Sequence, residues 1–500
     1  MLDERTPILI GAGQATQRDV DPAEAKEPLL LMADVARRAA RDAGAPGVLP
    51  RLDTIAVVNI LSWHYANAPR LLAEQLAAHP TQEIYTRVGG NTPQFLVNEL
   101  AAQIAAGRTQ LALIAGAETV RTLLRARRLG VELPWTTGGD GRPTVLGEAR
   151  NGTTDHEVNH ALQMPTAIYP LFENALRAHY GLSLDAHRQR LGELCSRLSA
   201  VAAHNPSAWF QQARSAAEIT TITPQNRYIG FPYPKYMNAI MEVDQAAAVL
   251  MTSVGTARAL GIDPSRWVYL WGAADAHDLW FISERVDYHS SPAIRVAGEQ
   301  ALQMAGLGIE HIDYFDLYSC FPSAVQIGRD MLGIAPDDPR PLTVTGGLPY
   351  HGGPGNNYVT HSIATMMDKL RATPGTTGLV TGLGWYVTKH AIGIYSTTPK
   401  DGVWSRPDPA SYQAALDRQP HPELVTEPHG HGTIETHTVL HDRDGQPVTG
   451  IVIGRLDDGR RFLANTSEDR VELESLMNRE AVGRPGVVTS SNGANRFDPQ

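Results

Sequence analysis

The chain has 500 residues, a hydrophobic content of 42% and a formal net charge of −10 at pH 7, which together predict two to four folded units with sizeable cores. The acidic balance argues against nucleic acid and anionic membranes as partners, and no apolar run approaches the ~20 residues that span a bilayer. Cys195 and Cys320 are the only cysteines and the N-terminus has no signal-peptide pattern, so a cytoplasmic location is expected, with a single disulfide left open.

The first half of the chain alternates strand-like and helical segments. Strands are predicted at 8–10, 55–58, 83–88, 111–115 and 243–252, and helices at 27–43, 69–78 and 92–106. Such alternation predicts parallel strands with helices on both faces of the sheet. Residues 121–241 interrupt the rhythm with helical runs and Pro-rich loops, and we expect them to form a large loop excursion from this core.

A second series of the same kind follows. Strands are predicted at 267–271, 314–317, 379–381 and 391–396, and helices at 292–305 and 357–371. We therefore expect two halves of similar topology, residues 1–260 and 261–400, and a Pro-rich linker at 401–422. Asp-Gly turns between alternating strands then predict an antiparallel β-barrel or sandwich at 423–500.

The segment 85–93 is a strand-turn-helix corner. Gly89 and Gly90 permit a tight turn, Thr92 is expected to cap the following helix, and Pro93 suits its first turn. The positive potential at a helix N-terminus suits a thiolate or an oxyanion. The turn contains neither Cys nor Ser, so the corner lacks a nucleophile.

Several segments together resemble the thiolase superfamily. They are the opening strand at 8–13, the segment 243–250 in place of the family's D-G-A-A-A strand, 318–321 in place of N-E-A-F or H-D-C-F, 346–355 in place of G-G-x-x-x-x-G-H-P-x-G, and 382–384 in place of C-x-G. The chain is most similar to the thiolase-like protein type 1 group, near the sterol-carrier-protein type thiolases, whose members carry an extra C-terminal β domain and are commonly labelled acetyl-CoA acetyltransferase. The resemblance implies an α/β thiolase fold, five-layered αβαβα from two similar halves, with a C-terminal antiparallel β-barrel.

The resemblance also shows which thiolase groups are missing. The nucleophilic cysteine is replaced by Gly89 or Gly90, and the C-x-G cysteine by Gly382. The G-H-P histidine becomes Gly353, although His351 lies two residues away. Without a thiolate no acyl-enzyme forms by the family's route, so ordinary thiolysis is not expected.

The candidate site residues follow from the same loops. Tyr318, which replaces the Asn or His of the family, is a candidate acid or base, and so are Tyr350, His351 and His390. Cys320 is either a relocated nucleophile or a packing residue. The candidate substrate-binding residues are Gly89, Gly90, Asn91, Thr92, Gly353 and Gly382.

Three functions remain open: a coenzyme A thioester-dependent enzyme of retro-aldol type, a non-catalytic binder of acyl-CoA or lipid, and an acyltransferase that uses Cys320. Some steroid-degrading relatives also carry Tyr at the position of Tyr318 and work with a separate β-barrel partner. Arg177, Arg188 and Lys235 either meet CoA phosphates or are solvated. The chain is expected to be a monomer or a homodimer.

No other cofactor is expected. Gly11-Ala12-Gly13 lacks the third glycine of a dinucleotide fingerprint, since Thr16 stands there, so a nucleotide cofactor is rejected. Four histidines fall in or near the predicted barrel: His429, His431, His437 and His441. Their spacing has no supporting Cys or carboxylate, so they predict surface positions on a strand rather than a metal site.

Overall fold

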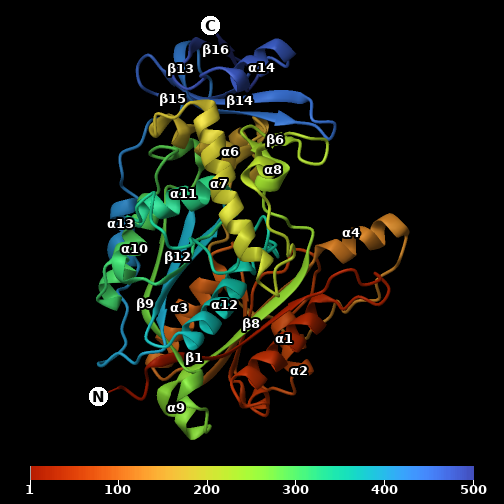
Figure 1. Ribbon diagram of the computed structural model, residues 1–500, viewed down its shortest axis with the longest axis vertical. Helices are drawn as coiled ribbons and strands as arrows, with labels where there is room; N and C mark the ends of the chain where they lie inside the picture. Colours follow the sequence, from red (N-terminus) through yellow and green to blue (C-terminus); the bar gives the residue numbers. More distant parts are fainter. Residues whose placement is uncertain (1) are drawn as a thin grey trace.

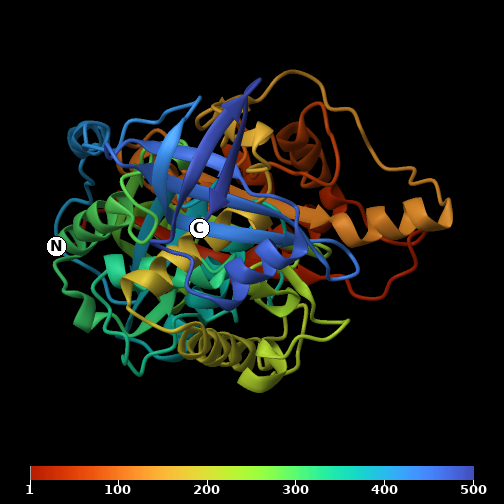
Figure 2. The ribbon, with the colours of Figure 1, turned by 90° about the horizontal axis from the view of Figure 1, so that it is seen from above.

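The structure is a computed structural model that describes residues 2–500. The molecule is elongated, with the N-terminal segments near one end of its long axis and the C-terminal barrel at the other (Figure 1). Helix α4 (Val120–Leu129) projects from the body in both views (Figures 1 and 2).

The larger part of the chain is built on one ten-stranded sheet with the order β10-β11-β12-β9-β1-β8-β4-β2-β3-β5. Its strands are β1 (Pro7–Thr16), β2 (Thr54–Val57), β3 (Gln82–Thr86), β4 (Leu111–Thr119), β5 (Thr144–Leu146), β8 (Asp244–Ser253), β9 (Val268–His277), β10 (Tyr314–Asp316), β11 (Thr377–Gly384) and β12 (Lys389–Ser396). All the predicted strands of this region are present, and most extend further than their apolar cores.

The strand order repeats within the sheet. The first half has the order β3-β2-β4-β8-β1, and the second half has β10-β11-β12-β9, which is the same order with the third strand absent. An irregular segment takes its place, since the Leu317 N–H donates to the carbonyl of Leu342 at 3.0 Å. The halves join where β1 pairs with β9, at Ile8–Tyr269 and Leu9–Val268.

Helices complete five layers. Helices α1 (Pro28–Asp42) and α2 (Ala68–Gln75) cover the outer face of the first half, and α10 (Pro292–Ala305) and α11 (Pro322–Met331) cover the second. Helices α3 (Thr92–Ala105) and α12 (Tyr358–Ala372) pack between the halves. Strand β1 is apolar on both faces because each face of the sheet is covered by helices. Ile8 and Ile10 pack in the cluster with α1, whereas Leu9 packs in the cluster with α3.

Helix α3 is buried at the centre, as its apolar residues predict. Its polar residues Gln94 and Asn98 are buried too, which the apolar face alone does not predict. The Asn98 amide donates to the Asp275 carboxylate at 3.0 Å and to the Ala274 carbonyl at 3.3 Å, both on β9. Such satisfied polar contacts allow the covered surface of the helix to extend beyond its apolar face.

Residues 121–241 contain more structure than a loop. They form β5, α4 to α8 and two short strands, whose remaining bounds are α5 (Asp155–Asn159), α6 (Pro165–His179), α7 (Leu184–Ala203), α8 (Ala216–Thr220), β6 (Tyr228–Gly230) and β7 (Tyr233–Pro234). Strand β5 pairs with the edge strand β3, and β6 pairs with a strand of the barrel. The short α9 (Val254–Ala259) follows β8.

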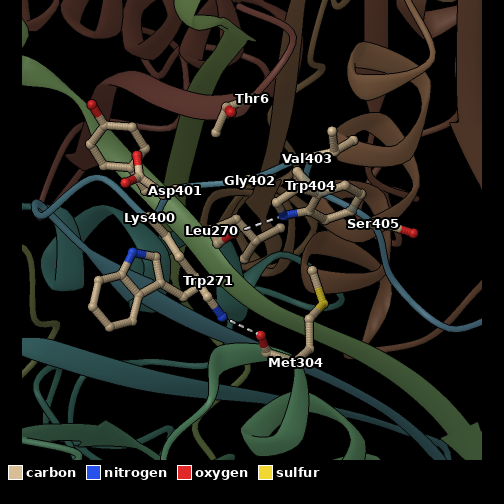
Figure 3. Close-up of a pocket in the computed structure, with 11 residues that line it drawn as sticks. Thr6, Leu270, Trp271, Met304, Lys400, Asp401, Gly402, Val403, Trp404 and Ser405 are labelled. Carbon is tan, nitrogen blue, oxygen red and sulfur yellow. Dashed lines mark hydrogen bonds between the residues drawn. The ribbon is translucent and has the colours of Figure 1, made fainter. Parts of the chain in front are cut away.

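The predicted linker is a folded strap. It contains α13 (Ala410–Leu416) and is held by partly buried polar contacts to β9. The Trp404 indole donates to the Leu270 carbonyl at 2.8 Å, and the Lys400 amine donates to the Met304 carbonyl; these groups border a cavity of about 70 Å³ (Figure 3). Pro-rich composition predicts irregular backbone, but these contacts decide that it is anchored.

The C-terminal region is a closed five-stranded barrel, as predicted. Its elements are β13 (Gly430–His441), β14 (Pro447–Leu456), β15 (Arg461–Asn465), α14 (Arg470–Asn478), β16 (Pro485–Ser491) and β17 (Ala494–Pro499). The strand order is β13-β14-β15-β17-β16, closing on β13, and only β15 and β17 pair in parallel. Helix α14 was not predicted.

One histidine of the barrel corrects the expectation of surface positions. His437 on β13 is 1% exposed, and its Nε2 lies 3.0 Å from the Leu476 carbonyl of α14. Burial lowers the pKa of His437 to about 4. The alternation of residues along the strand did not predict the burial of His437, because α14 and α6 cover the face of β13 on which His437 lies.

Candidate active site

The corner between β3 and α3 forms as predicted, with one change in its capping. Asn91 is the residue before the helix, and its side chain makes no capping hydrogen bond. Thr92 is instead the first helical residue, and its hydroxyl donates to the Gly89 carbonyl at 2.8 Å. The Gly89 N–H donates to Asn356 Oδ1 at 2.8 Å, which ties the turn to the Gly-rich loop.

The space beside both glycines of the turn is already filled. A methyl group on Gly90 would overlap the Tyr318 hydroxyl and would lie 2.6 Å from the Leu383 carbonyl. A methyl group on Gly89 would lie 2.8 Å from Nζ of Lys389. Beside the two glycines, this chain therefore holds the Tyr318 phenol, which comes from the loop after β10, and the Lys389 amine, which comes from β12.

Tyr318 lies just beyond β10, with its ring against the turn. Its N–H donates to Thr381 Oγ1 at 2.8 Å, and its ring meets that of Tyr358 edge-on, with centroids 5.7 Å apart. Burial raises the pKa of Tyr318 well above the ordinary value. The phenol therefore stays neutral, which suits a hydrogen-bond donor rather than a base.

The Gly-rich loop is held onto the end of β10 by one buried carboxylate. Asp316 Oδ2 accepts from the Val344 N–H at 2.9 Å and from Thr345 Oγ1 at 3.0 Å, and Oδ1 accepts from Ser362 at 2.7 Å. The loop then continues past the residue after Tyr318, since the Leu348 N–H donates to Ser319 Oγ at 3.3 Å.

This placement separates Tyr350 and His351 from Tyr318. The His351 ring packs on Tyr358 and His361, with centroids 5.7 Å and 5.0 Å away, and burial lowers its pKa to about 4. Tyr350 is 2% exposed, and burial raises its pKa well above the ordinary value, with a further contribution from Cys195. Neither side chain lines the cavities that border the corner.

His390 does lie beside the corner. Its Nε2 is 3.0 Å from the Val387 carbonyl and 3.5 Å from the Asp278 carboxylate. Since a carbonyl only accepts, Nε2 carries the proton in the neutral ring, and Nδ1 is the free acceptor. Among the described residues Nδ1 has no hydrogen-bond partner.

Two hollows border the corner. A void of about 10 Å³ lies between Tyr318, Gly382 and His390. A larger cavity of about 280 Å³ opens on the other side of the turn, and it is lined by Arg87, Asn91, Thr92, Phe95, Gly147, Glu148, Asp275, Ala276, His277, Trp280, Lys389, His390, Pro409, Ala410 and Gln413. His390 borders both hollows and so connects the two sides of the corner.

The remaining candidate site residues, Cys320, Gly353 and Gly382, are buried, lie away from the corner or pack against other residues. Cys320 is 8% exposed, and burial raises its pKa to about 12, so it stays a thiol. The Gly353 N–H donates to the Ile240 carbonyl at 2.8 Å, away from both hollows. Gly382 packs on Asn91: a methyl group there would lie 2.9 Å from the Asn91 Cα.

One basic candidate is neither solvated nor free to meet a phosphate. The side chain of Arg177 is 2% exposed, and it donates to Glu480 at 2.6 Å and to the Leu182 carbonyl at 2.9 Å. Arg188 and Lys235 are exposed. In residues 2–500, no group of three or more His, Cys, Asp and Glu side chains could hold a metal ion, and no helix is long and apolar enough to span a membrane.

Sequence reasoning missed the groups that complete the corner. Lys389, Asn356 and Trp280 were not predicted as site residues. A lysine at the start of the apolar strand 389–396 was the one signal available, because a buried strand rarely carries an unpaired charge. Asn356 and Trp280 give no such signal.

The repeated strand order, the five layers and the two central helices define the class of protein, a thiolase fold with an added barrel. The structure of a monomeric SCP2-thiolase like protein type 1 from Mycobacterium smegmatis is 38% identical and covers 100% of both chains, with a TM-score of 0.86. The family model "Thiolase-like protein type 1 additional C-terminal domain" matches residues 411–492. The chain belongs to the thiolase-like protein type 1 family.

More distant structures share the fold alone. The Ltp2-ChsH2(DUF35) aldolase is 18% identical over 79% of this chain and 99% of its own, with a TM-score of 0.59. The dimeric peroxisomal thiolase of Saccharomyces cerevisiae is 12% identical over 79% of this chain and 98% of its own, with a TM-score of 0.55. No curated protein matches the chain.

Proposed function

We propose that the chain binds an acyl-CoA thioester at the corner and cleaves a carbon–carbon bond of it by a retro-aldol route. The observation that carries this proposal is that the Tyr318 hydroxyl and the Lys389 amine fill the space beside Gly90 and Gly89, where the resemblance places the family's nucleophile. A retro-aldol cleavage needs a proton acceptor and a hydrogen-bond donor but no nucleophile, whereas thiolysis needs a thiolate.

The residues at the corner suit the two roles. His390 Nδ1 takes the proton of a β-hydroxyl group, while Nε2–H stays on the Val387 carbonyl. The Cα–Cβ bond breaks, its electron pair moves into the thioester enolate, and the Tyr318 phenol donates to the enolate oxygen. Return of the proton to Cα releases a shorter acyl-CoA and an aldehyde or ketone.

The comparisons support the reaction class only by analogy. An aldolase is among the structures that share the fold, and its likeness to this chain is low. We further propose that the protein works as a monomer in the cytoplasm, as the monomeric relative suggests for the oligomeric state.

The test is turnover of a panel of 3-hydroxyacyl-CoA esters that carry tertiary hydroxyl groups. We expect one carbonyl product, captured with a hydrazine reagent, and one shorter acyl-CoA, identified by mass spectrometry. Tyr318→Phe should lower kcat by roughly 100-fold or more with little change in acyl-CoA affinity. Tyr314→Phe is the matched control, since its hydroxyl lies 3.1 Å from Thr373 on an exposed edge.

The proposal fails if no ester in the panel releases a carbonyl compound, or if Tyr318→Phe turns over as fast as the unchanged protein. A parallel assay addresses the acyltransferase alternative. We expect no thiolysis of acetoacetyl-CoA, and thiolysis that Cys320→Ser abolishes would restore that alternative.

A non-catalytic binder is the second candidate function. The small void of about 10 Å³ beside Tyr318 favours it, because a thioester enters there only if side chains move, whereas a ligand in the cavity of about 280 Å³ would be bound without reaching Tyr318. Native mass spectrometry with the same esters separates the two functions: a binder forms complexes of unchanged mass, whereas an aldolase releases the shorter acyl-CoA.

A further inference from the structure

Lys389 is the buried lysine of this chain. The other lysines, Lys26, Lys235, Lys369 and Lys400, are all exposed, whereas Lys389 is 8% exposed at the start of β12. Its side chain crosses to the corner, where Nζ donates to the Val88 carbonyl at 2.6 Å. No carboxylate of the described residues lies within ion-pair distance of it, so its charge is not compensated by a direct partner.

Lys389 adjoins a cavity and two indole rings. It lines the cavity of about 280 Å³ together with Trp280 and Phe95. Its Nζ lies 6.0 Å from the centre of the Trp280 ring and 5.5 Å from that of Trp385. The other charged and titratable groups that line the cavity are Arg87, Glu148, Asp275, His277 and His390. Burial lowers the pKa of Lys389 to about 8, against a smaller opposing effect of Glu148.

The turn that presents Lys389 is strained. Trp385 and Val387 have positive φ angles of 55° and 58°. Such angles are costly for a bulky residue such as Trp385 and for a β-branched residue such as Val387. Buried donors hold the turn in this shape: the Tyr169 hydroxyl donates to the Trp385 carbonyl at 3.0 Å, and Arg285 donates to the Val387 carbonyl at 2.9 Å. Strain that is over-determined in this way is typical of functional sites.

We propose that Lys389 is a reactive amine that captures small aldehydes or ketones in this cavity as an imine. The observations that carry the proposal are the position of Nζ at the corner, 2.8 Å from where a side chain on Gly89 would begin, its lack of an ion-pair partner among the described residues, and the adjoining cavity that Lys389 lines. A lysine that is desolvated in an apolar pocket is a nucleophile toward carbonyl compounds. The proposal goes beyond the retro-aldol function and does not require it.

The step balances without a co-reactant. The lone pair of the neutral amine attacks the carbonyl carbon and forms the C–N bond, and the oxygen takes up a proton to give a carbinolamine. Loss of water then leaves the C=N bond of the imine, and the amine proton returns to solvent. His390, which lines the same cavity, can carry these protons.

The experiment traps the imine. The full-length protein is treated with limiting butanal and cyanoborohydride at a pH of about 8, near the pKa of this amine, and each lysine is then quantified by peptide mass mapping. We expect the butyl group at Lys389 at a rate about tenfold or more above that at the exposed lysines. Lys400 is the matched internal control, because its amine also donates to a carbonyl, that of Met304, but on the surface.

Two variants keep the proposal falsifiable if Lys389 also supports the fold. Glu148→Gln, at an exposed position, should raise the rate at Lys389 roughly two- to threefold near pH 7, because it removes the group that raises the pKa of the amine. Lys389→Arg should lose this label and leave the others unchanged. A purely structural lysine would be protected, so labelling at Lys389 that is slower than at Lys400 would overturn the proposal.

Discussion

Gly90 is the residue of the corner that lies against the Tyr318 hydroxyl. Its missing side chain leaves the space in which the Tyr318 hydroxyl lies, so the two positions are coupled by direct contact. Substitution of one without the other leaves either an overlap or a gap.

We predict that Gly90→Ala lowers the free energy of unfolding by about 1–3 kcal/mol, because the methyl group overlaps the Tyr318 hydroxyl. Removal of that hydroxyl by Tyr318→Phe should restore part of the loss, so the double variant should be more stable than the sum of the single effects indicates. Urea unfolding of the four proteins measures the coupling. If the two losses of unfolding free energy are strictly additive, the methyl group at residue 90 is opposed by the backbone and not by Tyr318.

Buried neutral histidines predict sensitivity to acid. Burial lowers the pKa of His351 from 6.5 to about 4, so the unfolded chain binds a proton in this range and the folded protein does not. The stability associated with His351 is therefore complete above pH 6.5 and falls as the pH decreases toward 4, by about 3 kcal/mol in total.

We predict that His351→Gln flattens the dependence of unfolding free energy on pH in this window by about 1.4 kcal/mol per pH unit. Denaturant unfolding at several pH values measures the slope. His311→Gln is the control, since the His311 side chain is 62% exposed. Equal slopes for the unchanged protein and His351→Gln would show that another group determines the acid response.

At the scale of elements, β5 is a three-residue strand with a large effect on the sheet. It pairs with β3, which is otherwise the edge of the first half, and the Arg87 N–H donates to the Leu146 carbonyl at 2.8 Å. An uncovered edge strand is a template for pairing with another chain. The residues just after β5, Gly147 and Glu148, also line the larger cavity.

We predict that Leu146→Pro raises the mass of the protein in solution to that of larger species. The Leu146 carbonyl accepts from the Arg87 N–H, so the Leu146 N–H also faces β3 in this parallel pair, and proline removes that donor and uncovers β3. Size-exclusion chromatography with light scattering measures the mass. Val145→Pro is the matched control, because the Val145 N–H points away from β3 and its loss should leave the mass unchanged. An unchanged mass for Leu146→Pro would mean that β5 does not protect this edge.

At the scale of the whole molecule, the barrel is joined to the thiolase fold by buried contacts rather than by a flexible tether. Asn174 of α6 donates to the His437 carbonyl of β13 at 2.9 Å, and Arg177 of the same helix pairs with Glu480. The strap at 401–422 packs along β9 as well. We therefore expect the barrel and the remainder to unfold together.

We predict that Glu480→Gln lowers the free energy of unfolding by about 1–3 kcal/mol, because it removes the ionic partner of the buried Arg177 guanidinium. Urea unfolding, followed by near-ultraviolet circular dichroism and by fluorescence, measures the loss and shows whether one transition persists. Glu468→Gln, at an exposed position of the barrel, is the control. A loss no greater than that of the control would contradict a stabilising role for this ion pair.

Local patterns in the sequence predict the alternation of strands and helices, the central helix 92–106 and the barrel, because apolar periodicity and Asp-Gly turns depend on neighbouring residues. The glycines at 89, 90 and 382 are likewise read directly from the sequence. What fills the space beside Gly89 and Gly90 could not be predicted in this way. Lys389 and Tyr318 reach the corner from segments that are distant in sequence, and such contacts depend on how the two halves pack. Burial of His437 and anchoring of the strap have the same cause, since both depend on surfaces contributed by other elements.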